Sequence, residues 1–159
     1  MDYLWTPWRY QYITASGNAP ECVFCLAGRS SDDRAHLVVH RGADNFVILN
    51  RFPYTSGHVM VVPYAHAATM DELPEEGLTE LMMLSREAAR RLGEVYRPEG
   101  LNLGMNLGKC AGAGIAGHLH MHVLPRWTGD TNFMTVAAET RVLPEALETT
   151  WERLRAVWK

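Results

Sequence analysis

The chain has 159 residues, of which 47 % are hydrophobic and 21 % are charged, and its net charge is −3. This length suits one domain with a sizeable core, and the slightly negative charge argues against a partner bound by a broad basic surface, such as nucleic acid. No apolar run approaches the roughly 20 residues of a membrane helix, so we expect no membrane partner. The start of the chain has no basic and then apolar signal segment, and we therefore expect a cytoplasmic protein with reduced cysteines.

The N-terminal half predicts an arm, three strands and a long helix. Residues 1–20 are rich in aromatic side chains, include LWTPWRYQYI (4–13) and are typical of an arm that packs over a surface. Short runs of β-branched and apolar residues predict strands at 36–40, 45–50 and 57–63. A helix is predicted over 74–96 because apolar or small residues recur at steps of three and four: Leu78, Leu81, Met82, Ser85, Ala88, Ala89, Leu92 and Val95.

The C-terminal half adds two strands and a second helix. The strands are expected at 101–108 and 118–125, and an amphipathic stretch runs from Pro144 to Lys159. Its apolar face consists of Leu147, Trp151, Leu154 and Trp158. Strands that surround one long helix favour an antiparallel α+β fold in a single domain over 1–159.

Three histidines alternate in GHLHMHVLPRW (117–127), at positions 118, 120 and 122. In a strand they would share one face, with Leu119, Met121 and Val123 on the core side. One interpretation is three unrelated histidines on a solvated face. All three cannot bind one metal ion, because 118 and 122 would lie about 13–14 Å apart whereas a zinc–nitrogen bond is about 2.0 Å. Two of the three could share an ion, or one could join ligands from elsewhere in the chain. The three histidines must therefore have different roles.

The segment HLHMHVL (118–124) resembles the signature of the histidine triad (HIT) superfamily. NRFPYTSGHVMVVPYAH (50–66) resembles the strand–turn–strand segment of that family, and GKCAGAGIAGH (108–118) resembles its glycine-rich loop. LWTPWR (4–9) and PRWTGDTNFM (125–134) are similar to a bacterial branch related to diadenosine polyphosphate (Ap4A) phosphorylases. The resemblance implies a HIT-like fold, with about five antiparallel strands, one long helix and a C-terminal helix. It divides the domain into the arm at 1–20, a catalytic core at 21–135 and a C-terminal extension at 136–159.

The resemblance also implies nucleotidyl transfer through a covalent histidine. The matching nucleophile is His120, whose neutral imidazole would attack the α-phosphorus of a nucleotide with an AMP moiety. His122 and His58 match residues that form hydrogen bonds with phosphate. The family usually forms homodimers with joined sheets, which we expect here.

The substrate-binding residues are carried over from the same resemblance. Asn50 matches a residue that binds a ribose hydroxyl, and Asn106 one near the sugar-phosphate; the alternative for each is an ordinary turn or strand-end asparagine. Gly112, Ala113 and Gly114 offer small side chains and free backbone N–H groups to a phosphate, although a plain glycine turn is the alternative. Many members have Gly-Gln-Ser in this loop, so the acceptor, water or inorganic phosphate, stays open.

A metal site is predicted beside these residues. Cys22 and Cys25 form a C-x-x-C pair, which is half of a zinc signature; redox chemistry is the alternative. In zinc-bearing relatives the other ligands match His66 and His118. The set would hold a structural zinc ion with four protein ligands.

Three other functions compete with the polyphosphate reaction. A nucleoside phosphoramidate hydrolase would use the same nucleophile, and a nucleotide-sensing protein would use the same pocket without turnover. A hydrolase with zinc as Lewis acid is disfavoured, because four protein ligands leave no open position on the ion.

Overall fold

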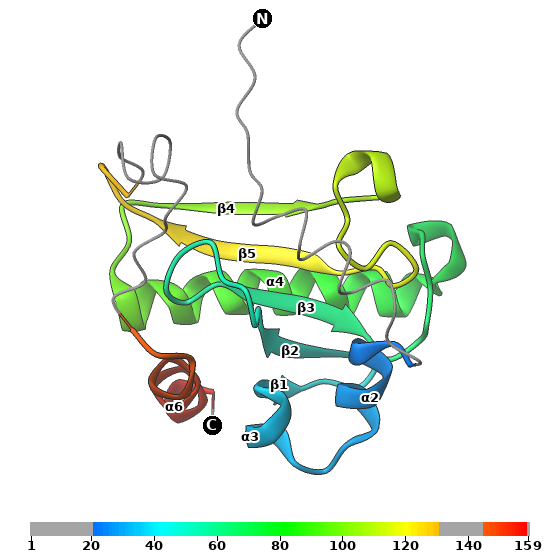
Figure 1. Cartoon of the computed structure of the whole chain (residues 1–159), viewed down its shortest axis with the longest axis horizontal. Coiled ribbons are helices and arrows are strands. Elements are labelled where there is room, and N and C mark those ends of the chain that lie inside the picture. The colour runs from blue at the N-terminus through cyan, green and yellow to red at the C-terminus, as the bar shows by residue number, and fades with distance from the viewer. Residues whose placement is uncertain (1–20, 131–144, 159) are drawn as a thin grey trace, which may run out of the picture.

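A computed structural model describes residues 21–130 and 145–158 of the chain (Figure 1). The predicted arm (1–20) and residues 131–144, which include the end of PRWTGDTNFM, lie outside the described residues. None of the described helices is long and apolar enough to span a lipid bilayer.

The described strands form one antiparallel sheet in the order β1-β2-β3-β5-β4. Their bounds are β1 Val38–Arg41, β2 Asn45–Leu49, β3 Val59–Pro63, β4 Gly100–Met105 and β5 Met121–Arg126. The main helices are α2 Val23–Arg29, α3 Asp33–His36, α4 Glu75–Tyr96 and α6 Leu147–Val157, with short 3-10 helices η1 Met70–Glu72 and η2 Lys109–Ala111. This arrangement confirms the predicted α+β fold with five antiparallel strands, a long helix and a C-terminal helix.

Helix α4 runs along one face of the sheet (Figure 1). Alternate residues of the central strands, including Val47, Val59 and Val61, pack with it in the main core. The buried positions of α4 include Leu81, Ser85, Ala88 and Leu92. The inclusion of Met82 in the predicted apolar face was wrong, since Met82 is 54 % exposed. Met82 follows Leu81 directly and is therefore rotated by about 100° from the line of contact with the sheet.

Helix α2 packs on part of the opposite face of the sheet, over β1, β2 and β3. Phe46, Ile48 and Met60, which alternate with the residues of the main core, pack in a second cluster with Phe24 and Ala27 of α2. Because both faces are covered, β2 and β3 are continuous apolar runs rather than alternating ones. The candidate site lies on this second face.

The predicted strand at 36–40 begins later than expected, at Val38. The preceding residues form α3, because the carboxylate of Asp32 accepts a hydrogen bond from the N–H of Ala35 at 3.0 Å and caps the helix. Leu37 then ends the helix in the left-handed region, with φ of 61°. Such a short helix offers no period for sequence analysis to detect.

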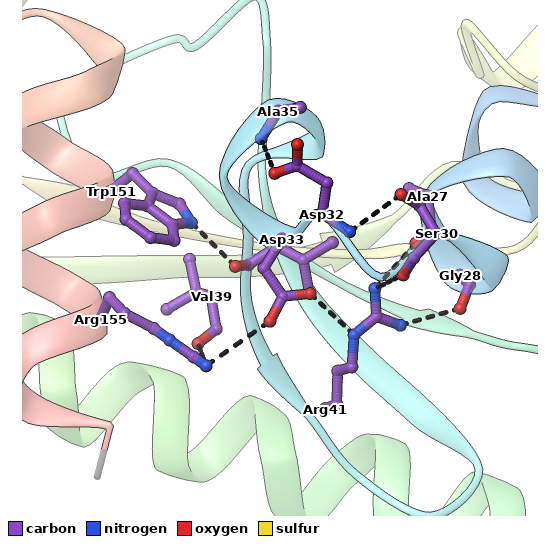
Figure 2. A network of polar contacts seen from close by, with 11 residues as sticks. Ala27, Gly28, Ser30, Asp32, Asp33, Ala35, Val39, Arg41, Trp151 and Arg155 are labelled. Carbon is purple, nitrogen blue, oxygen red and sulfur yellow. Dashed lines mark hydrogen bonds and ion pairs between the residues drawn. The ribbon is translucent and has the colours of Figure 1, made fainter.

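Helix α6 protects the free edge of β1 (Figure 2). The indole Nε1–H of Trp151 donates to the carbonyl of Val38 at 2.8 Å, and Arg155 donates to the carbonyl of Val39 at 2.7 Å. Leu154 and Trp158 are buried in the main core, as the amphipathic pattern predicts. These contacts satisfy edge carbonyls that could otherwise pair with another chain.

Glu80 ties the turn between β1 and β2 to α4. Its carboxylate accepts hydrogen bonds from the backbone N–H groups of Ala43, Asp44 and Asn45 at 2.7–2.8 Å, and from the Asn45 side chain at 2.9 Å. Burial alone would raise the pKa of Glu80, but these donors outweigh it and lower the pKa. The ionised carboxylate is thus part of the folded structure.

We predict that Glu80→Gln lowers the free energy of unfolding at pH 7 by about 1–3 kcal/mol, because charge-assisted hydrogen bonds are lost. The lowered pKa means that the stabilisation is complete above the ordinary carboxyl pKa and is lost as the pH falls through the folded value. In urea unfolding at several pH values, the free energies of unfolding of the wild type and Glu80→Gln should therefore converge at low pH. Glu76→Gln, at an exposed position on the same helix, is the control; equal stability of the two variants at pH 7 would refute the role of Glu80.

Candidate active site and adjoining metal cluster

The three alternating histidines are all buried, with 1 %, 6 % and 9 % of His118, His120 and His122 exposed. The predicted strand at 118–125 begins only at Met121, so His118 and His120 precede β5 and His122 lies within it. Leu119 and Met121 pack in the main core, as predicted. The histidine rings therefore reach the α2 face, and each of them contacts a different set of partners.

His118 contacts the C-x-x-C pair. Its Nε2 lies 2.9 Å from the carbonyl oxygen of Pro63. Because a carbonyl can only accept, the proton is on Nε2 and the lone pair is on Nδ1. This Nδ1 lies 3.3 Å from Sγ of Cys22, 3.6 Å from Sγ of Cys25 and 3.2 Å from Nδ1 of His66.

The four predicted metal ligands meet in one cluster. Sγ of Cys22 and Cys25 and Nδ1 of His66 and His118 all lie within 4.8 Å of one another. Two thiols and two imidazoles are a donor set that zinc prefers for a closed structural site, and the bond from His118 to Pro63 fixes the ligating tautomer. Burial, and then the adjacent Cys22, raise the pKa of the Cys25 thiol. Forming the thiolate here is therefore unfavourable without a nearby positive charge, which a bound cation would supply. The residues present therefore fit a zinc ion.

His120 presents an imidazole that is suited to act as a nucleophile. Its Nδ1 lies 2.8 Å from the carbonyl oxygen of His118. The carbonyl must accept, so Nδ1 carries the proton and Nε2 the lone pair. Burial lowers the pKa of His120, against the opposing effect of this backbone hydrogen bond, and thus favours the neutral ring at pH 7. The ring of Phe24 in α2 packs 5.1 Å from the His120 ring.

His58 and His122 form a hydrogen-bonded pair, with 2.9 Å between Nε2 of His58 and Nδ1 of His122. The backbone N–H of Tyr54 donates to Nδ1 of His58 at 3.1 Å, which places the proton of the neutral His58 ring on Nε2. His58 then donates to His122, and the neutral His122 ring carries its own proton on Nε2. The ring centroids of His120 and His122 lie 4.9 Å apart. Neighbouring rings thus offer a lone pair and an N–H donor.

Asn50 is buried in the turn that holds His58. Its Oδ1 accepts from the N–H of Phe52 at 2.9 Å, and its Nδ2 lies 3.5 Å from Nδ1 of His58. Asn50 therefore acts as a turn asparagine, the alternative to ribose binding that the sequence analysis kept; its contact with a ribose stays a prediction. Asn106 directly follows β4 and is half-buried, and its contact with the sugar-phosphate stays a prediction.

The glycine-rich loop differs in part from the expectation. The N–H of Gly112 donates to Lys109 at 3.0 Å and that of Ala113 donates to Gly108 at 3.4 Å. The expectation of free N–H groups is therefore wrong at these two positions, because η2 uses them to close its own turn. Gly112 has φ of 87°, a conformation that favours glycine. Phosphate binding by Gly112, Ala113 and Gly114 stays a prediction.

Two aromatic residues of the site were not predicted. Phe24 lies between the cysteines and contacts the rings of both His118 and His120. The Tyr54 ring lies 4.7 Å from that of His58 and stacks with that of His122 at 6.1 Å. The only sequence signal was their position, inside the C-x-x-C pair and four residues before His58.

Comparisons with known proteins agree with this geometry. The HIT domain family matches residues 33–129. The AP-4-A phosphorylase of Mycobacterium tuberculosis is 39 % identical over 166 residues, which cover 99 % of this chain and 85 % of the relative. A Zn-bound histidine triad family protein from Mycobacterium smegmatis is 29 % identical with a TM-score of 0.69, over 89 % of this chain and 93 % of the other. A hypothetical histidine triad nucleotide-binding protein from Sulfolobus tokodaii is 27 % identical with a TM-score of 0.67, over 85 % of this chain and 90 % of the other.

We predict that Cys25→Ser weakens zinc binding and lowers the melting temperature of the zinc-loaded protein by about 10 °C, because the metal stabilises only the folded chain. A chelator should lower the melting temperature of the wild type by a similar amount and leave the variant almost unchanged. Metal content and thermal unfolding measure both effects. The matched control is Cys110→Ser, which removes an exposed thiol; if both variants kept the zinc and stability of the wild type, the cluster would not be a metal site.

Proposed function

This chain belongs to the HIT domain family, and on that premise we propose that it transfers the nucleotidyl group of a dinucleoside polyphosphate through a covalent intermediate on His120. The observation that carries the proposal is the bond from His120 Nδ1 to the carbonyl of His118. It leaves Nε2 of a buried neutral ring as the nucleophilic atom. The M. tuberculosis relative, an AP-4-A phosphorylase, supports diadenosine tetraphosphate as the substrate.

In the first step, Nε2 of His120 attacks the α-phosphorus of the bound substrate. A phosphorus–nitrogen bond forms, the bond from this phosphorus to the bridging oxygen breaks, and ATP leaves with the electron pair. The His120 ring becomes positively charged, and the His118 carbonyl stabilises it through the Nδ1–H. In this proposal, the Nε2–H of His122 donates to an oxygen of the transferring phosphoryl group.

In the second step, an acceptor releases the nucleotidyl group from His120. Inorganic phosphate as the acceptor yields ADP, whereas water yields AMP. We propose phosphate, and the support is the phosphorylase name of the 39 % identical relative.

The metal site serves the reaction through its protein ligands. Bound zinc would supply structural cross-linking, and Cys22, Cys25, His66 and His118 are the residues that would hold it. The ion would fix the side chain of His118, whose backbone carbonyl orients His120. The thiols of the cluster also support our proposal of a cytoplasmic location, where cysteines remain reduced.

A substrate panel tests the proposed function. The wild type should convert diadenosine tetraphosphate to ADP and ATP only when phosphate is present, and His120→Asn should lower kcat by at least about 10³-fold. His36→Asn, in α3, is the control and should keep the activity. Product chromatography distinguishes the alternatives: AMP with ATP indicates hydrolysis, turnover of adenosine phosphoramidate alone indicates a phosphoramidase, and tight binding without turnover indicates a sensor. Undiminished activity of His120→Asn would contradict the proposed nucleophile.

We also propose that the chain forms a homodimer through β4. This strand lies at the edge of the sheet. Leu103 within it is 47 % exposed, and Leu107, two residues after its end, is 41 % exposed. Light scattering should give twice the chain mass for the wild type, and Leu103→Glu should shift the equilibrium toward monomer by burying a charge at the joint. Met82→Glu, at an exposed position on α4, should leave the mass unchanged. A monomeric wild type would overturn this proposal.

A further inference from the structure

The C-terminal end of α2 is held by the guanidinium group of Arg41 in β1 (Figure 2). Nη1 donates to the carbonyl of Gly28 at 2.8 Å, and Nη2 donates to those of Ala27 at 3.0 Å and Ser30 at 2.6 Å. The last carbonyls of a helix have no partner within the helix, and a cation there also interacts favourably with the helix dipole. Arg41 therefore caps α2 with three charge-assisted hydrogen bonds.

Arg41 is itself held in place. Its Nε donates to Oδ1 of Asp33 at 2.8 Å, and Oδ2 of Asp33 lies 3.5 Å from Nη2 of Arg155 in α6 (Figure 2). The side chains of Arg41 and Asp33 are 28 % and 22 % exposed, so water screens this pair less than an ordinary surface pair. The guanidinium group is thus held by Asp33 of α3, which is in turn paired with Arg155 of α6.

The other end of α2 contacts the proposed reaction centre. Cys22 precedes the helix, Cys25 lies in its first turn, and the Phe24 ring packs 5.4 Å from the His118 ring and 5.1 Å from the His120 ring. The helix has only seven residues, and a helix this short is unstable without tertiary contacts. Its placement therefore depends on its two ends and on the packing of Phe24 and Ala27.

We propose that Arg41 is a positioning residue for the metal cluster and for His120. By fixing the end of α2, it sets Cys25 for metal binding and seats Phe24 against the two histidine rings. The effect on His120 rests on the proposed nucleotidyl transfer, whereas the effect on metal retention does not. Arg41 touches neither the metal ligands nor the histidines, so it acts through the helix.

The test compares Arg41→Met, Arg41→Lys and a matched control. Arg34→Met is the control, because Arg34 lies next to Asp33 in α3 and forms an ion pair with Glu152 in which both side chains are more than half exposed. For each zinc-loaded protein, the release of zinc to a chromogenic chelator and the kcat and KM for diadenosine tetraphosphate are measured. We expect Arg41→Met to release zinc about 10-fold faster and to lower kcat about 10-fold with little change in KM.

The conservative variant separates positioning from general stability. Lysine keeps the charge but has no planar fork of donors, so Arg41→Lys should lie between the wild type and Arg41→Met in zinc release and in kcat. Arg34→Met should match the wild type in both. If Arg41→Met lowered only the melting temperature, with zinc release and kcat unchanged, the proposal would be overturned.

The test also covers a variant that does not fold and a wild type that has no activity. If Arg41→Met does not fold, Arg41→Lys decides the question by the same measurements, and wild-type zinc release in that variant overturns the proposal. If the wild type has no activity on diadenosine tetraphosphate, the proposed function fails, while the comparison of zinc release still decides whether Arg41 positions the cluster.

Discussion

The hydrogen bond between Nδ1 of His120 and the carbonyl oxygen of His118, 2.8 Å long, is the contact on which the site depends. It selects the tautomer of His120 and directs the lone pair to Nε2. The same residue, His118, uses its side chain for the cysteine cluster and for the carbonyl of Pro63. The predicted metal ligand, His118, and the proposed nucleophile, His120, are therefore only two residues apart in the backbone, and any contact that holds His118 also orients His120.

The other histidines complement this arrangement through the opposite tautomer. The backbone N–H of Tyr54 fixes the proton of His58 on Nε2, and His58 in turn fixes the proton of His122 on Nε2. A lone pair on one ring and a donor on the next are what attack on a phosphoryl group requires. A backbone carbonyl sets the tautomer of His120, and a backbone N–H sets that of His58, which in turn sets that of His122, so the order of donors and acceptors follows from the fold.

The shared face of the histidines and the long helix α4 could both be predicted from the sequence, because each has a regular period. Alternation in HLHMHVL separates the histidines from Leu119 and Met121, and the period of 74–96 matches α4 almost to the residue. The short helix α2 could not be foreseen, because seven residues after a cysteine cap show no period. The carbonyls of Pro63 and His118 and the internal N–H bonds of the glycine loop belong to the backbone, and no residue type announces them. The role of Arg41 depends on contacts between β1 and α2 that no local pattern contains.

The central claim is that His120, and neither of its histidine neighbours, forms a bond with the nucleotide. The most direct measurement is rapid mixing of enzyme with diadenosine tetraphosphate in the absence of phosphate, a quench without acid, and mass spectrometry of the peptide that contains residues 118–122. The account predicts one adenylyl group on this peptide, located on His120, that disappears with formation of ADP when phosphate is added. An adenylyl group on His118 or His122, or full turnover without any covalent species, would contradict it.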